Sequence, residues 1–241
     1  MSKKIYLDNA CTSQVDERTF ACAQRYVNLY QNTNKSASDV TRELRSYLTD
    51  ARRTVAEFIG CDSDEIALVQ CTSHAMGIIA NAVPMERGDN VLICDLEYQA
   101  SVACWMTRVK REGIVLREVK SHHGTISPAD FEAAMDEHTR AIVLASVQEI
   151  NGFRADVRAI ARMAHRDCDF YCAGAKKWIG NPFGMGFLYI RRSLAQSLEP
   201  MYYSYFNLKT PQRFPDYISY LEDPSRNPFD DCDVYQDATK F

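Results

Sequence analysis

The sequence lacks the long hydrophobic run that a membrane-spanning helix requires. No apolar stretch approaches about 18 residues, and the opening MSKKIYLDNA lacks the apolar segment of a signal peptide. We therefore expect no membrane association and a cytoplasmic location. An excess of basic charge is also missing, since 28 Lys and Arg stand against 32 Asp and Glu and the net charge is −4. This balance does not favour nucleic acid as a partner.

Paired cysteine motifs are absent as well. The nine cysteines are scattered over 241 residues and no C-x-x-C pair occurs, which argues against a zinc ribbon or a thioredoxin-like site. A secreted disulfide scaffold would concentrate its cysteines in a short chain. Cys71 and Cys94 end apolar runs, where a thiol behaves as a small buried hydrophobe. We expect reduced structural thiols and no metal site.

Short apolar runs alternate with amphipathic stretches along the chain. Hydrophobic residues make up 46% and charged residues 25%, as in ordinary globular proteins. The alternation predicts an α/β fold with a mainly parallel sheet and helices on both faces. Strands are expected over residues 66–71, 90–94, 114–119, 141–146, 169–172 and 186–190. Helices are expected over residues 38–59, 75–83 and 155–166, and another begins at Ser127-Pro128.

The amino-acid composition of the sequence changes near Glu199. From there it is rich in tyrosine, proline and aspartate and has no clear period. Its aromatic content indicates that it needs a surface to lie on, in this chain or in a partner. The sequence therefore predicts a large domain over residues 1–198 and an irregular C-terminal arm over residues 199–241.

The first candidate site is Cys71-Thr72-Ser73-His74, which follows an apolar strand and precedes a helical run. Unpaired backbone N–H groups, the positive end of the helix dipole and hydroxyl side chains together suit a phosphate. The alternative is an ordinary helix N-cap. Neither the P-loop nor the G-x-G-x-x-G motif accompanies it, so a nucleoside triphosphate or a dinucleotide is disfavoured.

The second candidate site holds Lys176 and Lys177, which lie between a predicted strand and a turn rich in glycine and proline. Apolar surroundings destabilise the charged form of a lysine side chain. The neutral amine is then favoured, and it is a nucleophile suited to forming a Schiff base. The alternative is a pair of solvated lysines in a loop.

The stretch AGAKKWIGNPFGMGFLYI resembles the lysine segment of the class V aminotransferase family, fold type I enzymes that use pyridoxal 5'-phosphate (PLP). Cysteine desulfurases and isopenicillin N epimerase-like proteins belong to this family. The resemblance extends up to about Arg192 and includes YLDNACTS, AEFIGCDSDEIALVQCTSHAMGIIANAV, GDNVLICDLEYQASVACW and SVQEINGFRADVRAIARMAHR. It implies a PLP-binding large domain over residues 1–198, an amino-acid substrate and a homodimer.

The resemblance assigns roles at both candidate sites. Lys177 takes the position of the lysine that forms the Schiff base, and Lys176 stands where many members have a phosphate-contacting histidine. Thr72 and Ser73 match the phosphate-binding turn, and His74 stands beside them where a glutamate is common. A lysine at position 176 would supply a cation to the phosphate instead.

Three further residues correspond to contacts of the cofactor ring. Tyr98 matches the aromatic position that stacks on the pyridine ring. Gln148 and Asn151 lie in the stretch that offers an amide to the cofactor's phenolic oxygen or to substrate. A one-residue ambiguity in the alignment leaves the choice between them open.

The sequence departs from the family pattern after residue 166. Family members have there a strand ending in an Asp-Gly-Ala-Gln-like motif, whose aspartate pairs with the pyridine nitrogen. Here AHRDC runs straight into DFYCAGAKKW, as if that strand had been removed. Asp167 and Asp169 are the nearby carboxylates that would have to replace the missing aspartate. Because that carboxylate makes the ring an electron sink, we expect slow carbanion chemistry without it.

The C-terminal small domain of the family has no counterpart in the sequence either, so Cys232 is not assigned the persulfide-forming role. The favoured hypothesis is a PLP-dependent enzyme acting on an amino acid, with aminotransfer, desulfuration and epimerisation left open. The competing hypothesis is a shortened, non-catalytic descendant or fragment that serves as a binding or dimerisation module. A third is that the sequence is an incomplete record of a longer chain.

Overall fold

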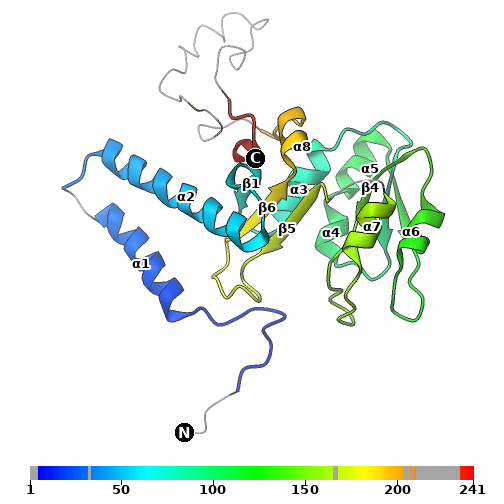
Figure 1. Ribbon diagram of the computed structural model, residues 1–241, viewed down its shortest axis with the longest axis horizontal. Coiled ribbons are helices and arrows are strands. Elements are labelled where there is room, and N and C mark those ends of the chain that lie inside the picture. The colour runs from blue at the N-terminus through cyan, green and yellow to red at the C-terminus, as the bar shows by residue number, and fades with distance from the viewer. Residues whose placement is uncertain (1–4, 32–33, 165–167, 203–206, 208, 210–233) are drawn as a thin grey trace, which may run out of the picture. The chain divides into compact units, whose positions relative to one another are not determined.

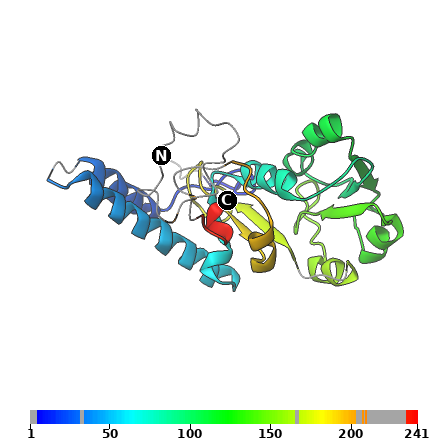
Figure 2. The same ribbon diagram turned by 90° about the horizontal axis from the view of Figure 1, so that it is seen from above.

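The chain divides into two compact units in the computed structural model, which describes residues 5–31, 34–164, 168–202, 207, 209 and 234–241 (Figures 1 and 2). The first unit comprises residues 1–72 and 172–241, and the second comprises residues 73–171. Most of the predicted C-terminal arm lies outside the described residues, and the division at residues 198 and 199 stays a prediction. No described helix is long and apolar enough to cross a membrane.

The second unit is built on a three-stranded parallel sheet. Its central strand, β2 (Asn90–Cys94), pairs with β3 (Val115–Val119) on one side and β4 (Thr139–Val143) on the other. All five residues of β2 are buried, as expected for the central strand of a sheet with both faces covered. The helices of this unit are α3 (Thr72–Ala82), α4 (Gln99–Ala103), α5 (Met106–Glu112), α6 (Pro128–Ala134) and α7 (Val157–Met163).

The two faces of this sheet are buried by different residues of β2. Leu92 packs in one cluster with Phe131 of α6 and Ile160 of α7. Val91 and Ile93 are also buried, and because side chains alternate along a strand they lie on the opposite face. The second unit therefore has the layered α/β arrangement that the sequence predicts.

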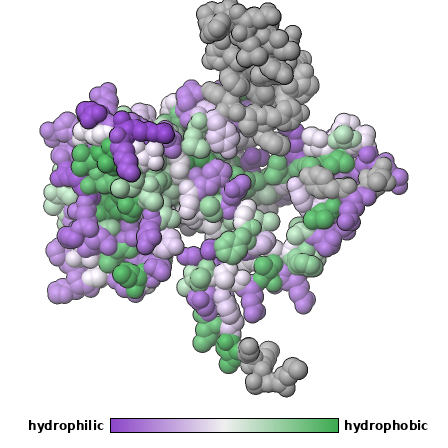
Figure 3. Space-filling model, turned by 180° about the vertical axis from the view of Figure 1, so that it is seen from behind, coloured by the Kyte–Doolittle hydropathy of each residue, from purple (hydrophilic) through white to green (hydrophobic). Residues whose placement is uncertain are grey.

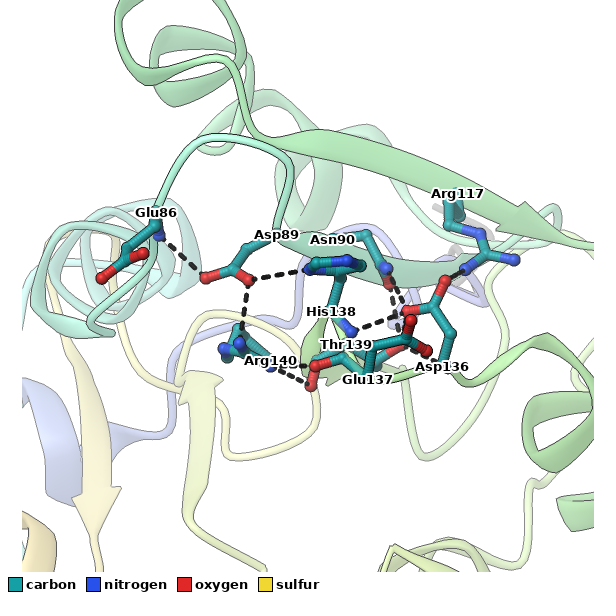
Figure 4. Close-up of polar contacts among 9 residues, drawn as sticks. All are labelled: Glu86, Asp89, Asn90, Arg117, Asp136, Glu137, His138, Thr139 and Arg140. Carbon is teal, nitrogen blue, oxygen red and sulfur yellow. Dashed lines mark hydrogen bonds and ion pairs between the residues drawn. The ribbon is translucent and has the colours of Figure 1, made fainter.

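A polar network joins the amino ends of β2 and β4 (Figure 4). The Asn90 side-chain amide donates to Asp136 at 2.7 Å and accepts from the Thr139 hydroxyl at 2.9 Å. The hydrogen bond from Asn90 lowers the pKa of Asp136 from its usual value. Asp89, which is buried, pairs with Arg140 at 3.0 Å. This network fixes the pairing of β4 with β2 and leaves the carboxyl ends of both strands for the loops that follow.

The first unit contains a second three-stranded sheet, in the order β1-β6-β5, in which β1 and β6 are antiparallel. The boundary between the units falls within β5. Helix α2 covers part of this sheet, because its Ala56 packs in one cluster with Ile66 and Phe187. The elements are α1 (Glu17–Gln31), α2 (Ala37–Ile59), β1 (Ile66–Val69), β5 (Phe170–Gly174), β6 (Gly186–Ile190) and α8 (Arg192–Ser197), with 3-10 turns at Ser63–Glu65 and Ala238–Lys240.

Close approach of β5 and β6 requires a glycine at position 186. A Cβ atom there would lie 2.8 Å from the Ala173 carbonyl oxygen, so the strands would have to move apart. We expect Gly186→Ala to lower the free energy of unfolding in urea by about 1–3 kcal/mol. The matched control is Gly77→Ala in α3, where a Cβ meets nothing within 4 Å. That variant should gain about 0.5–1 kcal/mol from helix propensity, and equal losses in both variants would contradict the packing argument.

Several predicted elements differ from the observed ones. The strand expected over residues 141–146 is observed at Thr139–Val143, because the polar network extends pairing to Thr139. The helix expected over residues 155–166 is α7, Val157–Met163, and it starts later because the Asp156 side chain caps it by accepting from Ala159 N. Helices α1, α4, α5 and α8 were not predicted.

Candidate functional site

The two lysines lie in the turn between β5 and β6, as the sequence predicts. Backbone hydrogen bonds close this turn: Ala175 N donates to Met185 O at 2.9 Å, and Gly180 N donates to Lys177 O at 3.0 Å. Lys176 and Lys177 are both half-buried. The turn therefore holds the Lys177 backbone in a defined place while its side chain remains partly accessible.

The N-terminal segment is bonded to this turn. Ser13 N donates to the Lys176 carbonyl oxygen at 2.8 Å, and the Thr12 hydroxyl donates to the same oxygen at 3.4 Å. Sequence reasoning matched YLDNACTS to the family but gave these two residues no role. Their contact joins positions 164 residues apart, which no local pattern reveals.

The Lys176 ammonium lies 4.3 Å from the centre of the Phe183 ring. A cation over an aromatic face at this distance is stabilised by about 0.5–1 kcal/mol at an exposed site. The proposed contact of Lys176 with phosphate is not tested by this arrangement and stays a prediction.

The start of α3 lies against the end of β5. A Cβ atom on Gly174 would lie 3.2 Å from the Thr72 hydroxyl oxygen, so the absence of a side chain there permits the close approach. Within the first unit, Thr72 is thus next to the strand that leads to Lys176 and Lys177. The structure brings together one residue of the first candidate site and the strand that carries the second.

Helix α3 begins earlier than predicted, so the predicted start is wrong. A helix from Ala75 was expected, whereas α3 begins at Thr72 and includes Ser73 and His74 in its first turn. Hydroxyl side chains are tolerated there because they can bond to nearby backbone groups. The first backbone N–H groups of a helix still have no partner within it, so the argument for an anion at this end is unchanged. The roles of Thr72, Ser73 and His74 stay predictions.

The second unit holds the residues predicted to contact the cofactor ring. Tyr98 directly precedes α4, which begins with a hydrogen bond from Ser101 N to Tyr98 O at 2.9 Å. The Tyr98 residue is 52% exposed. The neighbouring Glu97 accepts from the Ala145 backbone N at 2.5 Å and from Gln148 Nε2 at 2.9 Å. The loops after β2 and β4 are joined through this carboxylate.

The structure separates the two amides between which the alignment did not choose. Gln148 is only 1% exposed and contacts Glu97, the neighbour of Tyr98. Asn151 is exposed, donates to Gly124 O at 2.7 Å and accepts from Phe153 N at 2.9 Å, so both ends of its amide serve the local turn. This arrangement gives Asn151 a role in holding the turn and Gln148 a contact with Glu97. Which amide contacts a ligand stays a prediction.

Two of the described cysteines, Cys94 and Cys104, are poor nucleophiles. Burial raises the pKa of Cys94 to about 11 and that of Cys104 to about 11, so neither is a thiolate at neutral pH. Among the residues that the structure describes, no group of three or more His, Cys, Asp or Glu could hold a metal ion. Cys232 and Asp167 lie outside the described residues.

Comparison with known proteins decides the family. The family model described as Aminotransferase class-V matches residues 5–167 and 166–227. The chain belongs to the class V aminotransferase family. The two matched segments meet at residues 166 and 167, where the sequence predicts that a strand is missing. A deletion at that point would divide the match in this way.

Curated family members similar to the chain are much longer. The chain is 29% identical over 222 residues to a probable cysteine desulfurase of Methanothermobacter thermautotrophicus, a match covering 82% of the chain and 55% of that protein. It is 27% identical over 229 residues to a cysteine desulfurase of Dickeya dadantii, covering 81% of the chain and 54% of that protein. The chain thus spans about half the length of these relatives, and the shortening expected from the sequence is confirmed.

Solved structures of similar fold confirm the predicted fold class. The cysteine desulfurase CsdA of Escherichia coli aligns with a TM-score of 0.77 at 18% identity, over 98% of this chain and 62% of that one. A mutant of the protein C-DES with glycine covalently linked to its PLP cofactor aligns with a TM-score of 0.74 at 16% identity, over 84% of this chain and 62% of that one. These likenesses establish the fold type I α/β architecture.

Proposed function

We propose that this family member binds PLP through Lys177 and acts on the amino group or side chain of an amino acid. The observation that carries the proposal is the lysine turn: a half-buried lysine follows β5, whose last residue, Gly174, approaches Thr72 at the start of α3. An amine and an anion-binding helix end are the two features that an aldehyde phosphate needs. The family membership and the PLP in a structural neighbour support the same choice.

The donor set of the described residues fits the cofactor in most respects. Thr72 and Ser73 supply hydroxyls and helix N–H groups for a phosphate, and Tyr98 offers an exposed ring face for stacking. Gln148 supplies a buried amide whose oxygen has no hydrogen-bond donor among the described residues. The exception is the pyridine nitrogen, because the sequence lacks the Asp-Gly-Ala-Gln-like motif that carries its carboxylate in the family.

In this proposal Lys177 Nζ would hold PLP covalently at its aldehyde carbon. When bound, PLP would supply an electron sink for negative charge at the substrate Cα. Lys177 Nζ would also be the group that accepts and returns the proton at Cα. The choice among aminotransfer, desulfuration and epimerisation stays open, and a cytoplasmic location stays a prediction.

A homodimer is part of the proposal. Helices α1 and α2 lie side by side, in contact through an edge-to-face pair of Tyr26 and Tyr47 rings (Figures 1 and 2). Apolar residues nevertheless stay exposed on them, among them Phe20 at 67% and Phe58 at 76%. The space-filling view likewise shows apolar residues among hydrophilic ones (Figure 3). A second copy would cover such residues, which supports association.

The second candidate function is a non-catalytic binding or dimerisation module. Its specific support is the sheet topology: the described strands form two separate three-stranded sheets, with β4 at an edge of one and β5 at an edge of the other. A missing strand would leave such edges and would also remove the carboxylate expected at its end.

Titration of the purified protein with PLP tests the proposal against this alternative. The proposed function predicts a saturable visible band that differs from that of free PLP and changes when an amino acid is added. Folded protein that gives no such band at any PLP concentration contradicts the proposed function and supports the module.

A further inference from the structure

The loop after β2 and the loop after β4 meet at one half-buried carboxylate, that of Glu97. Glu97 Oε1 accepts from Gln148 Nε2 at 2.9 Å and from the Ala145 backbone N at 2.5 Å. Two donors from the second loop therefore converge on one oxygen from the first. The contact crosses 51 residues of sequence and is internal to the second unit.

The Gln148 backbone is held as firmly as its side chain. Gln148 N donates to Phe153 O at 2.8 Å, and Gln148 O accepts from Gly152 N at 2.9 Å. An isolated bridge between Val147 and Arg154 closes the same turn. With its backbone fixed in this way, the direction of the amide depends on what the end of the side chain contacts.

Contact with Glu97 determines the orientation of the Gln148 side-chain amide, because only its NH2 end can donate to the carboxylate. A carboxylate accepts hydrogen bonds only, so the Gln148 NH2 group must face Glu97 and the carbonyl oxygen must point away. That oxygen, Oε1, is buried and has no hydrogen-bond donor among the described residues. Glu97 Oε2 is also buried without a donor there. A buried acceptor without a donor is costly, which points to a donor that arrives with a ligand.

We propose that Glu97 is a positioning residue that turns the Gln148 amide so that its oxygen accepts a hydrogen bond from a protonated group of the bound ligand. The inference rests on the proposed function, in which the ligand is PLP joined to an amine. Its protonated groups are a phenolic O–H or a protonated nitrogen. An amide with the opposite orientation would present its NH2 group and would favour a deprotonated oxygen.

The proposal predicts how the bound chromophore titrates with pH. An acceptor oxygen and a nearby negative charge both stabilise the protonated ligand, so both raise the pH at which it loses its proton. Glu97→Gln removes the charge and lets the Gln148 amide reverse, so the midpoint should fall by about one pH unit. Gln148→Met removes the acceptor at similar length and should lower the midpoint in the same direction.

The experiment is a spectroscopic pH titration of PLP-loaded protein, with Glu149→Gln as the matched control. Glu149 is exposed and undergoes the same change of charge, so its variant should keep the wild-type midpoint. In ligand-free protein, hydrogen exchange of the Gln148 side-chain NH2, followed by NMR, should be slow in wild type and at least about tenfold faster in Glu97→Gln.

The two readouts distinguish failure of this inference from failure of the proposed function. A wild-type protein without a chromophore overturns the proposed function, and with it the ligand part of the inference, while NH2 exchange still decides whether Glu97 holds the amide. A wild-type chromophore whose midpoint is unchanged in Glu97→Gln and Gln148→Met overturns the inference alone. A midpoint that falls equally in Glu149→Gln also overturns it, because a general effect of charge would then suffice.

Discussion

Lys177→Ala should abolish the covalent bond to PLP and its visible band completely, because no other amine would occupy the position from which the aldehyde is attacked. Lys177 follows Ala175 in a turn closed by three backbone hydrogen bonds, and its own carbonyl accepts from Gly180 N. Alanine keeps these backbone contacts, so the variant should fold and unfold as wild type does. The measurement is an absorption spectrum with saturating PLP, together with a urea unfolding curve.

Lys176→Ala is the matched control for this variant. Its ammonium lies over the Phe183 ring, and its proposed role is contact with phosphate. Loss of one such charge-assisted contact should weaken PLP binding by about tenfold to a hundredfold and leave the covalent bond possible. Equal loss of the band in both variants would contradict the assignment of Lys177.

Arg108→Ala should lower the free energy of unfolding by about 3 kcal/mol, the largest stability effect expected from a single polar side chain here. Arg108 Nη1 donates to the Ala80 and Val83 carbonyl oxygens at 2.7 and 2.6 Å. Its guanidinium also pairs with Glu112 at 2.5 Å, and its side chain is only 7% exposed. The substitution would deprive the buried Ala80 carbonyl and the half-buried Val83 carbonyl, at and just after the end of α3, of this donor.

Lys110→Ala, on the exposed side of the same helix α5, provides the control and should change stability by less than about 0.5 kcal/mol. Urea unfolding of both variants measures the difference. Because α3 also carries Thr72 at its other end, Arg108→Ala should weaken PLP binding as well as stability. A loss below about 1 kcal/mol would show that Arg108 does not anchor this helix.

The buried strands are the part of the fold that sequence patterns predict well. Strand β2 of the parallel sheet and strand β6, which is antiparallel to β1, have the predicted bounds because each is mostly apolar. The start of β4 was missed because Thr139 and Arg140 are polar, and their placement depends on Asn90 and Asp89, 49 and 51 residues away. A hydrophobicity pattern contains no information on such contacts.

The short helices show a different limit of sequence reasoning. Helix α5 is only seven residues long and is stabilised by the contact of Arg108 with the end of α3, not by a long apolar stripe. Helix α1 has a single buried apolar residue, Leu29, among those whose burial is described. Helix α5 is therefore too short to show the repeated apolar spacing on which a prediction could rest. Helix α1 does show such spacing at Phe20, Ala23 and Val27, and the prediction overlooked it.

The candidate site was predictable only where its residues follow a strand directly. Lys177 lies in the turn expected for it, and Thr72 lies at the end of α3 expected to bind an anion. The different contacts of Gln148 and Asn151 could not be predicted, because they depend on Glu97 and Gly124. Glu97 itself was passed over, although an acidic residue in the loop that follows a buried strand and directly before an aromatic residue is a signal that could have been used.

Borohydride reduction of the PLP-loaded protein, followed by peptide mapping, tests the central claim most directly. Reduction makes the bond between the lysine nitrogen and PLP permanent, so the modified residue can be identified by mass spectrometry. The account predicts stoichiometric modification of Lys177 in the wild-type protein. Modification spread over several exposed lysines, or its complete absence from Lys177, would contradict it.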